Sequence, residues 1–367
     1  NLIAHRGPDD SSFFIDDYVA FGHRRLSIID LNTRSNQPMQ YKSLNIVFNG
    51  EIYNYQDIRQ MLTDEGYIFD TDGDCEVIIK SYDFWGEKCV EKFSGMWSFA
   101  IYDTKKKLIF CSRDRFGIKP FYYKVEDGNF YFGSEIKQLL NNNYEAETDN
   151  VIDYIFAGYV DHNEKTFFKD INQLLPSHNM TIEINKNKLD MKISTYFDIN
   201  DNISGKKNIK KLLDKSIKDH LIADVKVGSC LSGGLDSSYV NHIISKNISK
   251  ATAIHCNSTD RKYSEVDKAK TVAKFLDLDL EIVEPSFDEF CNDIDTLFYL
   301  QEQPFGDPSI YMQYKVMEKA SHLGIKVMLD GQGADEAFMG YSKYLGSRIF
   351  EDIINLKWLT AINSKIL

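Results

Sequence analysis

Hydrophobic and polar positions follow two different periods along the chain. Up to about residue 200, short β-branched and aromatic runs bounded by turn residues are typical of antiparallel strands. They cover residues 20–30, 44–49, 96–103, 108–112, 121–125 and 130–133. Residues 55–65 and 75–93 instead repeat apolar side chains at helical spacing. This part of the chain therefore predicts an α+β domain built on antiparallel sheets.

The pattern changes near residue 208 to an alternation of strands and helices. Strands are predicted at 225–231, 251–256, 280–283 and 325–329, and helices at 237–245, 264–276, 311–321 and from 334 onward. Such alternation predicts an α/β domain with a parallel sheet and helices on both faces. Residues 141–207 are less regular, and we interpret them as the end of the first domain plus a linker. We therefore expect domains at residues 1–200 and 206–367.

The composition narrows the classes of function. The chain has 43 Lys and Arg against 55 Asp and Glu, and its net charge of −12 disfavours binding to a nucleic-acid backbone. No run approaches the roughly 18 apolar residues that a membrane span needs. Six cysteines are scattered without a CxxC pair. The sequence thus predicts a cytoplasmic protein with neither a disulfide framework nor a zinc knuckle.

A glycine-rich loop between a predicted strand and a predicted helix has the pattern of a phosphate site. In Ser232-Gly233-Gly234-Leu235-Asp236-Ser237-Ser238 the glycines let backbone amides turn inward at a helix N-terminus, and the serines add hydroxyl donors. The predicted pyrophosphate-binding residues are Leu231, Ser232, Gly233, Gly234, Asp236, Ser237 and Ser238. Asp236 is also predicted to hold Mg²⁺. No lysine follows the glycines, which excludes a Walker loop. A structural turn with a serine cap is the alternative.

A second loop of this kind follows the last predicted strand, at residues 329–336. It places two glycines and two carboxylates at the carboxyl end of a strand, the edge at which open parallel sheets bind ligands. We predict that Asp330 and Gly331 contact the nucleotide and that Asp335 is a second metal ligand. The alternative for the acidic pair Asp335 and Glu336 is stabilisation of the next helix at its N-terminus.

Together, these motifs point to a known family. The 232–238 loop resembles the pyrophosphate loop of the ATP-pyrophosphatase superfamily, whose members adenylate a carbonyl or carboxylate. With residues 302–309 and the second loop, the second half resembles the synthetase domain of glutamine-dependent asparagine synthetases. The resemblance implies an adenine nucleotide α-hydrolase-like fold, and it implies that Asp307 and Gln332 contact the acceptor or its adenylate. The family commonly has Glu where this chain has Gln332, and Gln cannot act as a general base.

The first half resembles the class II glutamine amidotransferase domain through residues 5–9, 25–30, 49–54 and 113–120. The resemblance implies an Ntn-hydrolase-like fold, with antiparallel sheets sandwiched by helices. It also implies that Asn49 and Gly50 form the oxyanion hole. The implied glutamine-binding residues are Arg25, Leu26, Ser27, Ile28, Ile29, Asn49, Gly50, Glu51 and Asp74. Among them Arg25 would bind the α-carboxylate, and Glu51 and Asp74 the ammonium group. Taken singly, each has a structural alternative, such as a turn, a solvated strand residue or a helix cap.

The resemblance leaves the nucleophile unassigned. The family uses an N-terminal cysteine whose own amine is the base, and no cysteine is residue 1 here. Cys75 lies in an apolar helical pattern and is assigned to the core. We therefore expect that a segment carrying the nucleophile precedes Asn1 and that the family's catalytic lysine lies beyond Leu367. The chain as written is expected to be inactive.

By resemblance, the intact enzyme hydrolyses glutamine, activates aspartate as an acyl-adenylate with ATP and Mg²⁺, and forms asparagine, AMP and pyrophosphate. The alternative is the same chemistry on another carboxylate, such as a sugar acid in surface-polysaccharide biosynthesis. A tRNA-modifying relative is disfavoured by the charge and the glutaminase motifs, and a catalytically inactive regulatory relative is the fourth hypothesis. We expect only small-molecule substrates, with no nucleic-acid or membrane partner, and we leave a homodimer open.

Overall fold

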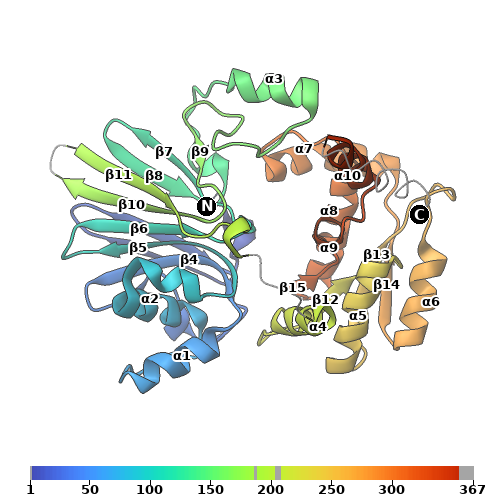
Figure 1. The fold of residues 1–367 in the computed structure, drawn as a ribbon, viewed down its shortest axis with the longest axis horizontal. Coiled ribbons are helices and arrows are strands. Elements are labelled where there is room, and N and C mark those ends of the chain that lie inside the picture. Colours follow the sequence, from blue (N-terminus) through green and yellow to red (C-terminus); the bar gives the residue numbers. More distant parts are fainter. Residues whose placement is uncertain (1, 186–187, 203–207, 355–367) are drawn as a thin grey trace. The chain divides into compact units, whose positions relative to one another are not determined.

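The computed structural model describes residues 2–185, 188–202 and 208–354 (Figure 1). Contacts divide the chain into two compact units. The first comprises Asn1–Val225 and Asp288–Tyr311, and the second comprises Lys226–Phe287 and Met312–Leu367. A short segment from the strand–helix half of the sequence therefore packs with the first unit. The domain boundaries expected at residues 200 and 206 stay a prediction.

A six-stranded antiparallel sheet forms the centre of the first unit. Its strand order is β11 (Lys188–Thr195), β10 (His178–Asn185), β6 (Leu108–Arg113), β5 (Gly95–Asp103), β4 (Leu44–Ile52) and β3 (Met39–Tyr41). Helices α1 (Tyr55–Asp64) and α2 (Asp74–Trp85) cover one face (Figure 1). Ile58 and Ile78 of these helices share a buried core with Ile46, Phe99 and Phe110 of the sheet. Burial of this apolar face stabilises the helix layer.

The other face of the large sheet packs against two smaller antiparallel sheets. One is the hairpin of β1 (Asp10–Ile15) and β2 (Ala20–Arg25), and the other joins β8 (Asn129–Gly133), β7 (Tyr122–Glu126) and β9 (Asn172–Gln173). Phe21 and Phe121 meet Val47 and Ala100 in the buried layer between them. Val47 alternates with Ile46 along β4, so successive residues fill opposite cores. The predicted antiparallel α+β class is confirmed.

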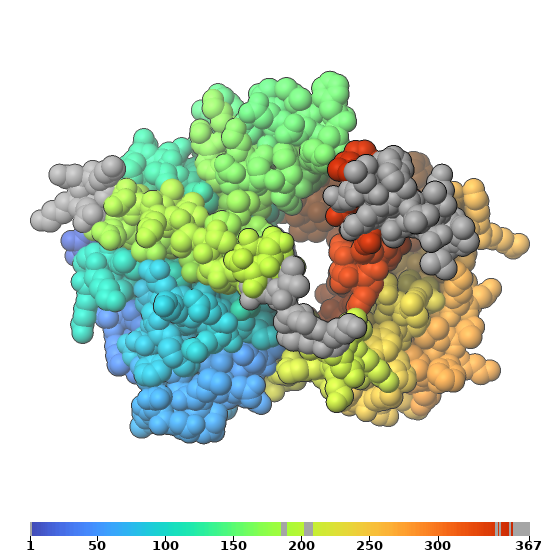
Figure 2. Space-filling view, viewed as in Figure 1, coloured from blue at the N-terminus to red at the C-terminus, as the bar shows by residue number. Residues whose placement is uncertain are grey.

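Two boundaries in this unit differ from the sequence expectation. The helix expected over 75–93 ends at Trp85, because Gly86 turns the backbone at φ 60°, and the 3₁₀ helix η3 (Gly86–Lys92) follows. The strand expected over 20–30 ends at Arg25, where a loop begins. The region interpreted as the end of the first domain plus a linker contains β10 and β11, which extend the large sheet. It also contains α3 (Thr148–Ala157), which lies on the surface of the first unit (Figure 2).

A four-stranded parallel sheet forms the second unit. Its order is β14 (Asp279–Val283), β13 (Thr252–Cys256), β12 (Val227–Cys230) and β15 (Val327–Leu329). Ala253 packs with Ala269 and Ala273 of α6 (Val266–Leu276), whereas the next residue, Ile254, packs with Val316 of α8 (Ser309–His322) on the opposite face. The predicted α/β class with helices on both faces is therefore confirmed.

The remaining elements connect these layers. They are η1 (Ala4–Arg6), η2 (Thr33–Ser35), η4 (Ile136–Gln138), η5 (Asn200–Asn202), α4 (Ile209–Asp219), α5 (Leu235–Asn247), α7 (Phe287–Gln301), α9 (Ala334–Phe338) and α10 (Ser342–Ile354). None of the described helices has both the length and the apolar character that crossing a membrane requires.

Candidate functional site

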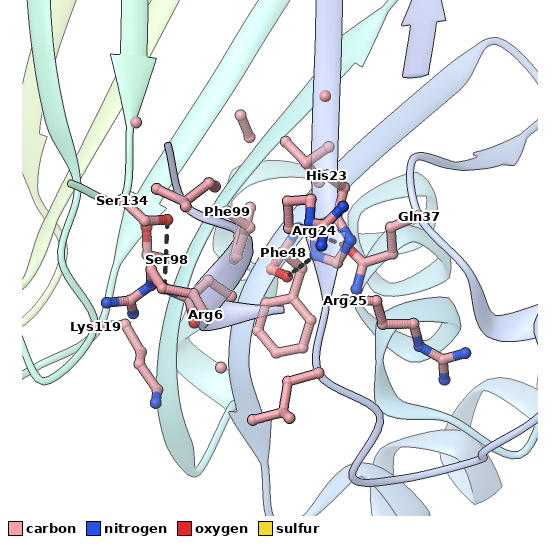
Figure 3. Close-up of a pocket in the computed structure, with 18 of the residues that line it drawn as sticks. Arg6, His23, Arg24, Arg25, Gln37, Phe48, Ser98, Phe99, Lys119 and Ser134 are labelled. Atoms are coloured by element: carbon pink, nitrogen blue, oxygen red, sulfur yellow. Dashed lines mark hydrogen bonds between the residues drawn. The ribbon is translucent and has the colours of Figure 1, made fainter. Parts of the chain in front are cut away.

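A cavity of about 780 Å³ opens in the first unit, between the β1–β2 hairpin, β4, β5 and the start of α2 (Figure 3). Most of the residues predicted to bind glutamine line it. They are Arg25, Leu26, Ile28, Ile29, Asn49, Gly50, Glu51 and Asp74. Ser27 is not part of the lining, and its amide donates to Oδ2 of Asp9 at 2.7 Å. Residues that are far apart in sequence thus meet in one cavity.

Arg25 ends β2 and is almost fully buried. Its Nη1 donates to the carbonyl of Asn32 at 2.8 Å and to Oδ1 of Asn36 at 2.7 Å. Its Nη2 donates to the carbonyls of Ile29 and Asp30. The guanidinium therefore shapes the loop that forms one wall of the cavity. To bind a carboxylate, Arg25 would have to use Nε or exchange one of these bonds.

Gly50 is held in a site without room for a side chain. It pairs with Trp97 across β4 and β5, and a Cβ atom there would lie 2.1 Å from the carbonyl oxygen of Met96. The close approach leaves the Gly50 backbone on the cavity wall. The neighbouring side chain, Asn49, also lines the cavity, and its Nδ2 lies 3.5 Å from Oγ of Ser134. These are the two groups predicted to form an oxyanion hole.

Two carboxylates come together in the same cavity. Asp74 opens α2 and accepts a hydrogen bond from the amide of Ile52 at 3.0 Å. Burial raises the pKa of Asp74 to about 6. Burial, and then the charge of Asp74, raise the pKa of Glu51 well above its usual value. Within the described residues, Oε2 of Glu51 is buried without a hydrogen-bond partner. The pair therefore carries a cost of burial that a cationic ligand group would reduce.

The glycine-rich loop of the second unit joins β12 to α5. Oγ of Ser237 lies 2.9 Å from Oγ of Ser232, which accepts a hydrogen bond from the amide of Gly234 at 3.2 Å. Gly233 has φ 84°, and a Cβ atom there would lie 2.6 Å from Cβ of Lys268. Buried Asn241 ties α5 to the strand, because its amide donates to the carbonyl of Cys230 at 3.0 Å. The loop is therefore fixed from both sides while its backbone stays accessible.

The second predicted loop lies against the first. β12 pairs in parallel with β15, so the loops after these two strands leave the sheet at the same edge. A Cβ atom on Gly331 would lie 3.1 Å from both Cβ of Asp236 and the amide of Ser237. Oδ1 of Asp330 accepts from the amide of Gln332 at 3.0 Å. The edge thus brings together the predicted nucleotide residues Leu231, Ser232, Gly233, Gly234, Asp236, Ser237, Ser238, Asp330 and Gly331.

Sequence comparisons match two consecutive regions of the chain to known families. Residues 1–197 match the family described as glutamine amidotransferase domain, and residues 208–361 match the family described as asparagine synthase. A putative glutamine-hydrolysing asparagine synthetase of Methanocaldococcus jannaschii is 35% identical over 99% of this chain and 76% of that protein. This chain belongs to the family of glutamine-hydrolysing asparagine synthetases.

Two further relatives show the range of this family. Asparagine synthetase 1 of Bacillus subtilis is 33% identical over 94% of the chain and 55% of its own length. A Penicillium rubens protein named amidase chyE is 28% identical over 96% of the chain and 55% of its own length. The chain therefore spans little more than half the length of these two relatives.

Residues of basic type, for which no role was predicted, also line the cavity. They include His23, Arg24 and Lys119 (Figure 3). Nε2 of His23 lies 3.2 Å from the carbonyl oxygen of Phe48, and burial lowers the His23 pKa to about 4, so the imidazole is neutral at neutral pH. Burial also lowers the pKa of Lys119. Alternate residues of a strand face the same side of a sheet, so His23 lies on the same face of β2 as Arg25. This alternation could have identified His23 as a cavity residue from the sequence.

The predicted acceptor residues of this asparagine synthetase relative belong to different units. Asp307 is exposed in the first unit, and its Oδ1 accepts from the amide of Ser309 at 2.7 Å. Gln332 is exposed in the second unit. Their assignment to an acceptor stays a prediction.

The predicted metal ligands fit only one mode of Mg²⁺ binding. Among the described residues, no group of three or more His, Cys, Asp or Glu is arranged to hold a metal ion. Asp236 and Asp335 supply carboxylates at the loop edge, and both are partly buried. Mg²⁺ is commonly held by one or two carboxylates together with substrate phosphates. The donor set therefore suits a metal that arrives with a nucleotide.

Proposed function

We propose that the protein is a glutamine-dependent amide-forming ligase. Glutamine and water give glutamate and ammonia in the first unit. ATP and a carboxylate then give an acyl-adenylate and pyrophosphate in the second unit. Ammonia attacks the acyl carbon, and the amide and AMP leave. The chain belongs to a family whose name combines glutamine hydrolysis with asparagine synthesis. Each unit contains a site that suits one of these two reactions.

The observation that carries the proposal is the carboxylate pair in the cavity. Glu51 has a buried oxygen without a partner among the described residues, and Asp74 shares its environment. A ligand with an ammonium group would pair with the negative charge of these two residues and reduce the cost of its burial. Asn49 and Gly50 line the same cavity and present the amide donors that an oxyanion requires. An α-amino acid with a side-chain amide, such as glutamine, satisfies both requirements.

The loop edge of the second unit supports the adenylation half. Backbone amides at a helix N-terminus and the Ser232 and Ser237 hydroxyls suit pyrophosphate, the leaving group of adenylation. Asp236 and Asp335 would hold Mg²⁺, which supplies charge neutralisation of the phosphates when bound. Loss of pyrophosphate, rather than phosphate, agrees with a loop that has no lysine after its glycines.

Aspartate is the first acceptor to consider, since several relatives are named asparagine synthetases. Gln332 supports the alternative of a different carboxylate, because an amide cannot accept the proton that attacking ammonia must lose. One relative, 28% identical to this chain, is named an amidase instead of an asparagine synthetase. A sugar acid is the alternative acceptor class.

The test is pyrophosphate release by the full-length protein with ATP and Mg²⁺. Ammonia or glutamine serves as the nitrogen source, and a panel of carboxylates is offered, including aspartate and hexuronic acids. We expect pyrophosphate and an amide product with one acceptor class and either nitrogen source. Release with a sugar acid but not with aspartate would replace the asparagine assignment by the alternative. No release with any carboxylate, with correctly folded protein, would reject the ligase.

A further inference from the structure

A buried carboxylate in the segment 288–311 holds the turn beside the cavity of the first unit. Glu302 follows α7, and its Oε1 and Oε2 accept hydrogen bonds from the amides of Lys137 and Ile136 at 2.6 and 2.8 Å. These amides open η4. Glu302 lies in the region that matches asparagine synthase, whereas η4 lies in the region that matches the amidotransferase domain. The contact therefore links the two family regions within one unit.

Charges extend this contact toward the cavity. Nζ of Lys137 lies 3.1 Å from Oε1 of Glu302 and 2.6 Å from Oε2 of Glu135. The other oxygen of Glu135 lies 2.7 Å from Nε2 of His5 and 3.3 Å from Nη1 of Arg6. The side chains of Glu135, Lys137 and Glu302 are 7%, 8% and 9% exposed. Buried charges of this kind depend strongly on one another, so loss of one leaves the others unpaired.

The backbone of Glu302 has a conformation that favours glycine. Its φ is 62°, the left-handed conformation in which a Cβ atom is disfavoured. The residue directly follows the last turn of α7, a position at which glycine is usual. A glycine would end the helix with less strain. The glutamate side chain supplies two hydrogen bonds and an ion pair that a glycine would lack.

The same turn connects to Asn49. Oε1 of Gln138, the last residue of η4, accepts hydrogen bonds from the amides of Ser134 and Glu135 at 3.0 Å. Ser134 lies on the cavity wall (Figure 3), and its Oγ is the acceptor for Nδ2 of Asn49 at 3.5 Å. Glu302 thus fixes the first turn of η4, η4 fixes Ser134, and Ser134 orients the Asn49 amide.

We propose that Glu302 is a positioning residue for glutamine hydrolysis. It holds η4 and, through Ser134, the amide of Asn49 at the place where the oxyanion forms. This inference rests on the proposed function, because it takes Asn49 as an oxyanion donor. It also assigns part of the control of glutamine hydrolysis to a residue of the asparagine synthase region.

The test compares Glu302→Gln with wild type in the full-length protein, measuring kcat and KM for glutamine hydrolysis. The number of working sites is counted by labelling with an alkylating glutamine analogue. In Glu302→Gln an NH₂ group replaces one of the two carboxylate oxygens, and it cannot accept a hydrogen bond from an η4 amide. Because η4 and Asn49 are then held less firmly, we expect kcat per labelled site to fall about tenfold. KM should change less than twofold, because the hydrogen bonds that hold Arg25 and Asp74 go to elements other than η4. Ser134→Ala should act in the same direction.

Gln303→Ala is the matched control. Gln303 is the next residue, and its Nε2 contacts Oδ1 of Asp161 at 3.1 Å instead of η4. The kcat of Gln303→Ala for glutamine hydrolysis should equal that of wild type. An unchanged kcat per labelled site in Glu302→Gln, or an equal loss in Gln303→Ala, overturns the proposal. If Glu302→Gln does not fold, Glu302→Asp is tested instead. Its shorter side chain withdraws the carboxylate from the η4 amides, and the same fall in kcat is expected. Absence of glutamine hydrolysis by wild type would instead reject the proposed function, and this inference with it.

Discussion

The cavity of the first unit and the loop edge of the second unit are built in opposite ways. The cavity is lined by buried, charged side chains from elements far apart in sequence, including β2, β4 and α2. The loop edge consists mainly of accessible backbone from two short contiguous segments. A site made of side chains depends on the core that positions it, whereas a site made of backbone depends on a few glycines. The two sites should therefore fail in different ways when mutated.

The largest effect is expected at Gly50. A Cβ atom there would overlap the carbonyl of Met96 inside the β4–β5 pairing, so Gly50→Ala must separate two central strands. We expect a loss of at least about 3 kcal/mol in the free energy of unfolding, measured by denaturant titration. Gly66→Ala is the control. Gly66 has a positive φ of 90°, as Gly50 has one of 154°, but a Cβ atom on Gly66 would meet nothing within 4 Å, so only the backbone strain of about 1 kcal/mol remains. Equal losses in both variants would contradict the packing argument.

The corresponding change in the loop is Gly233→Ala. Its Cβ atom would lie 2.6 Å from Cβ of Lys268 and 2.8 Å from the amide of Ala269, so the loop must move off α6. We expect ATP-dependent pyrophosphate release to fall at least about 100-fold, while glutamine hydrolysis is retained. In Gly234→Ala, the nearest contact is Oγ of Ser232 at 3.2 Å, and a much smaller loss is expected. Parallel loss of both activities in Gly233→Ala would show that the two sites are not independent.

The same contrast explains what the sequence could predict. The glycine-rich loop that we propose to bind the nucleotide can be recognised from sequence, because its residues are the seven consecutive positions 232–238 and a strand and a helix flank them. The fold classes followed from hydrophobic periodicity. The contacts of Glu302 with η4 span 165 residues and depend on how a segment folds back onto the first unit, which no local pattern specifies. Likewise, burial is the main cause of the low pKa of His23, and burial is a property of the folded chain.

The carboxylate pair predicts a pH dependence. Because the folded pKa of Asp74, about 6, lies above its ordinary value of 3.8, the folded state holds the proton more tightly. The contribution of Asp74 to the free energy of unfolding therefore falls as pH rises from about 4 to 6, and the loss remains above pH 6. Asp74→Asn should raise the thermal midpoint at pH 8 by a few degrees and not at pH 4. It should also raise KM for glutamine about tenfold or more, because one partner of the ammonium group is lost.

Exposed Asp57 on α1 is the control for this experiment. Asp57→Asn should change neither the pH profile nor KM. In wild type, KM for glutamine should rise as pH falls below about 6, since protonated Asp74 no longer attracts the ammonium group. A KM that is constant from pH 8 to 5 would contradict the prediction that the carboxylate pair binds the ammonium group of glutamine.

The smallest effect is expected at Ser232, and it tests how far a site made of backbone depends on side chains. Ser232→Ala removes the acceptor for the Gly234 amide but leaves the glycines and Asn241 to hold the loop. One neutral hydrogen bond contributes about 0.5–1.5 kcal/mol, so KM for ATP should rise about three- to tenfold with kcat unchanged. Ser245→Ala is the control, because Ser245 lies further along α5 and its hydroxyl donates to the carbonyl of His242, so KM should not change. A 100-fold loss in Ser232→Ala would mean that its hydroxyl, rather than the backbone, dominates phosphate binding, and the contrast between the two sites would then fail.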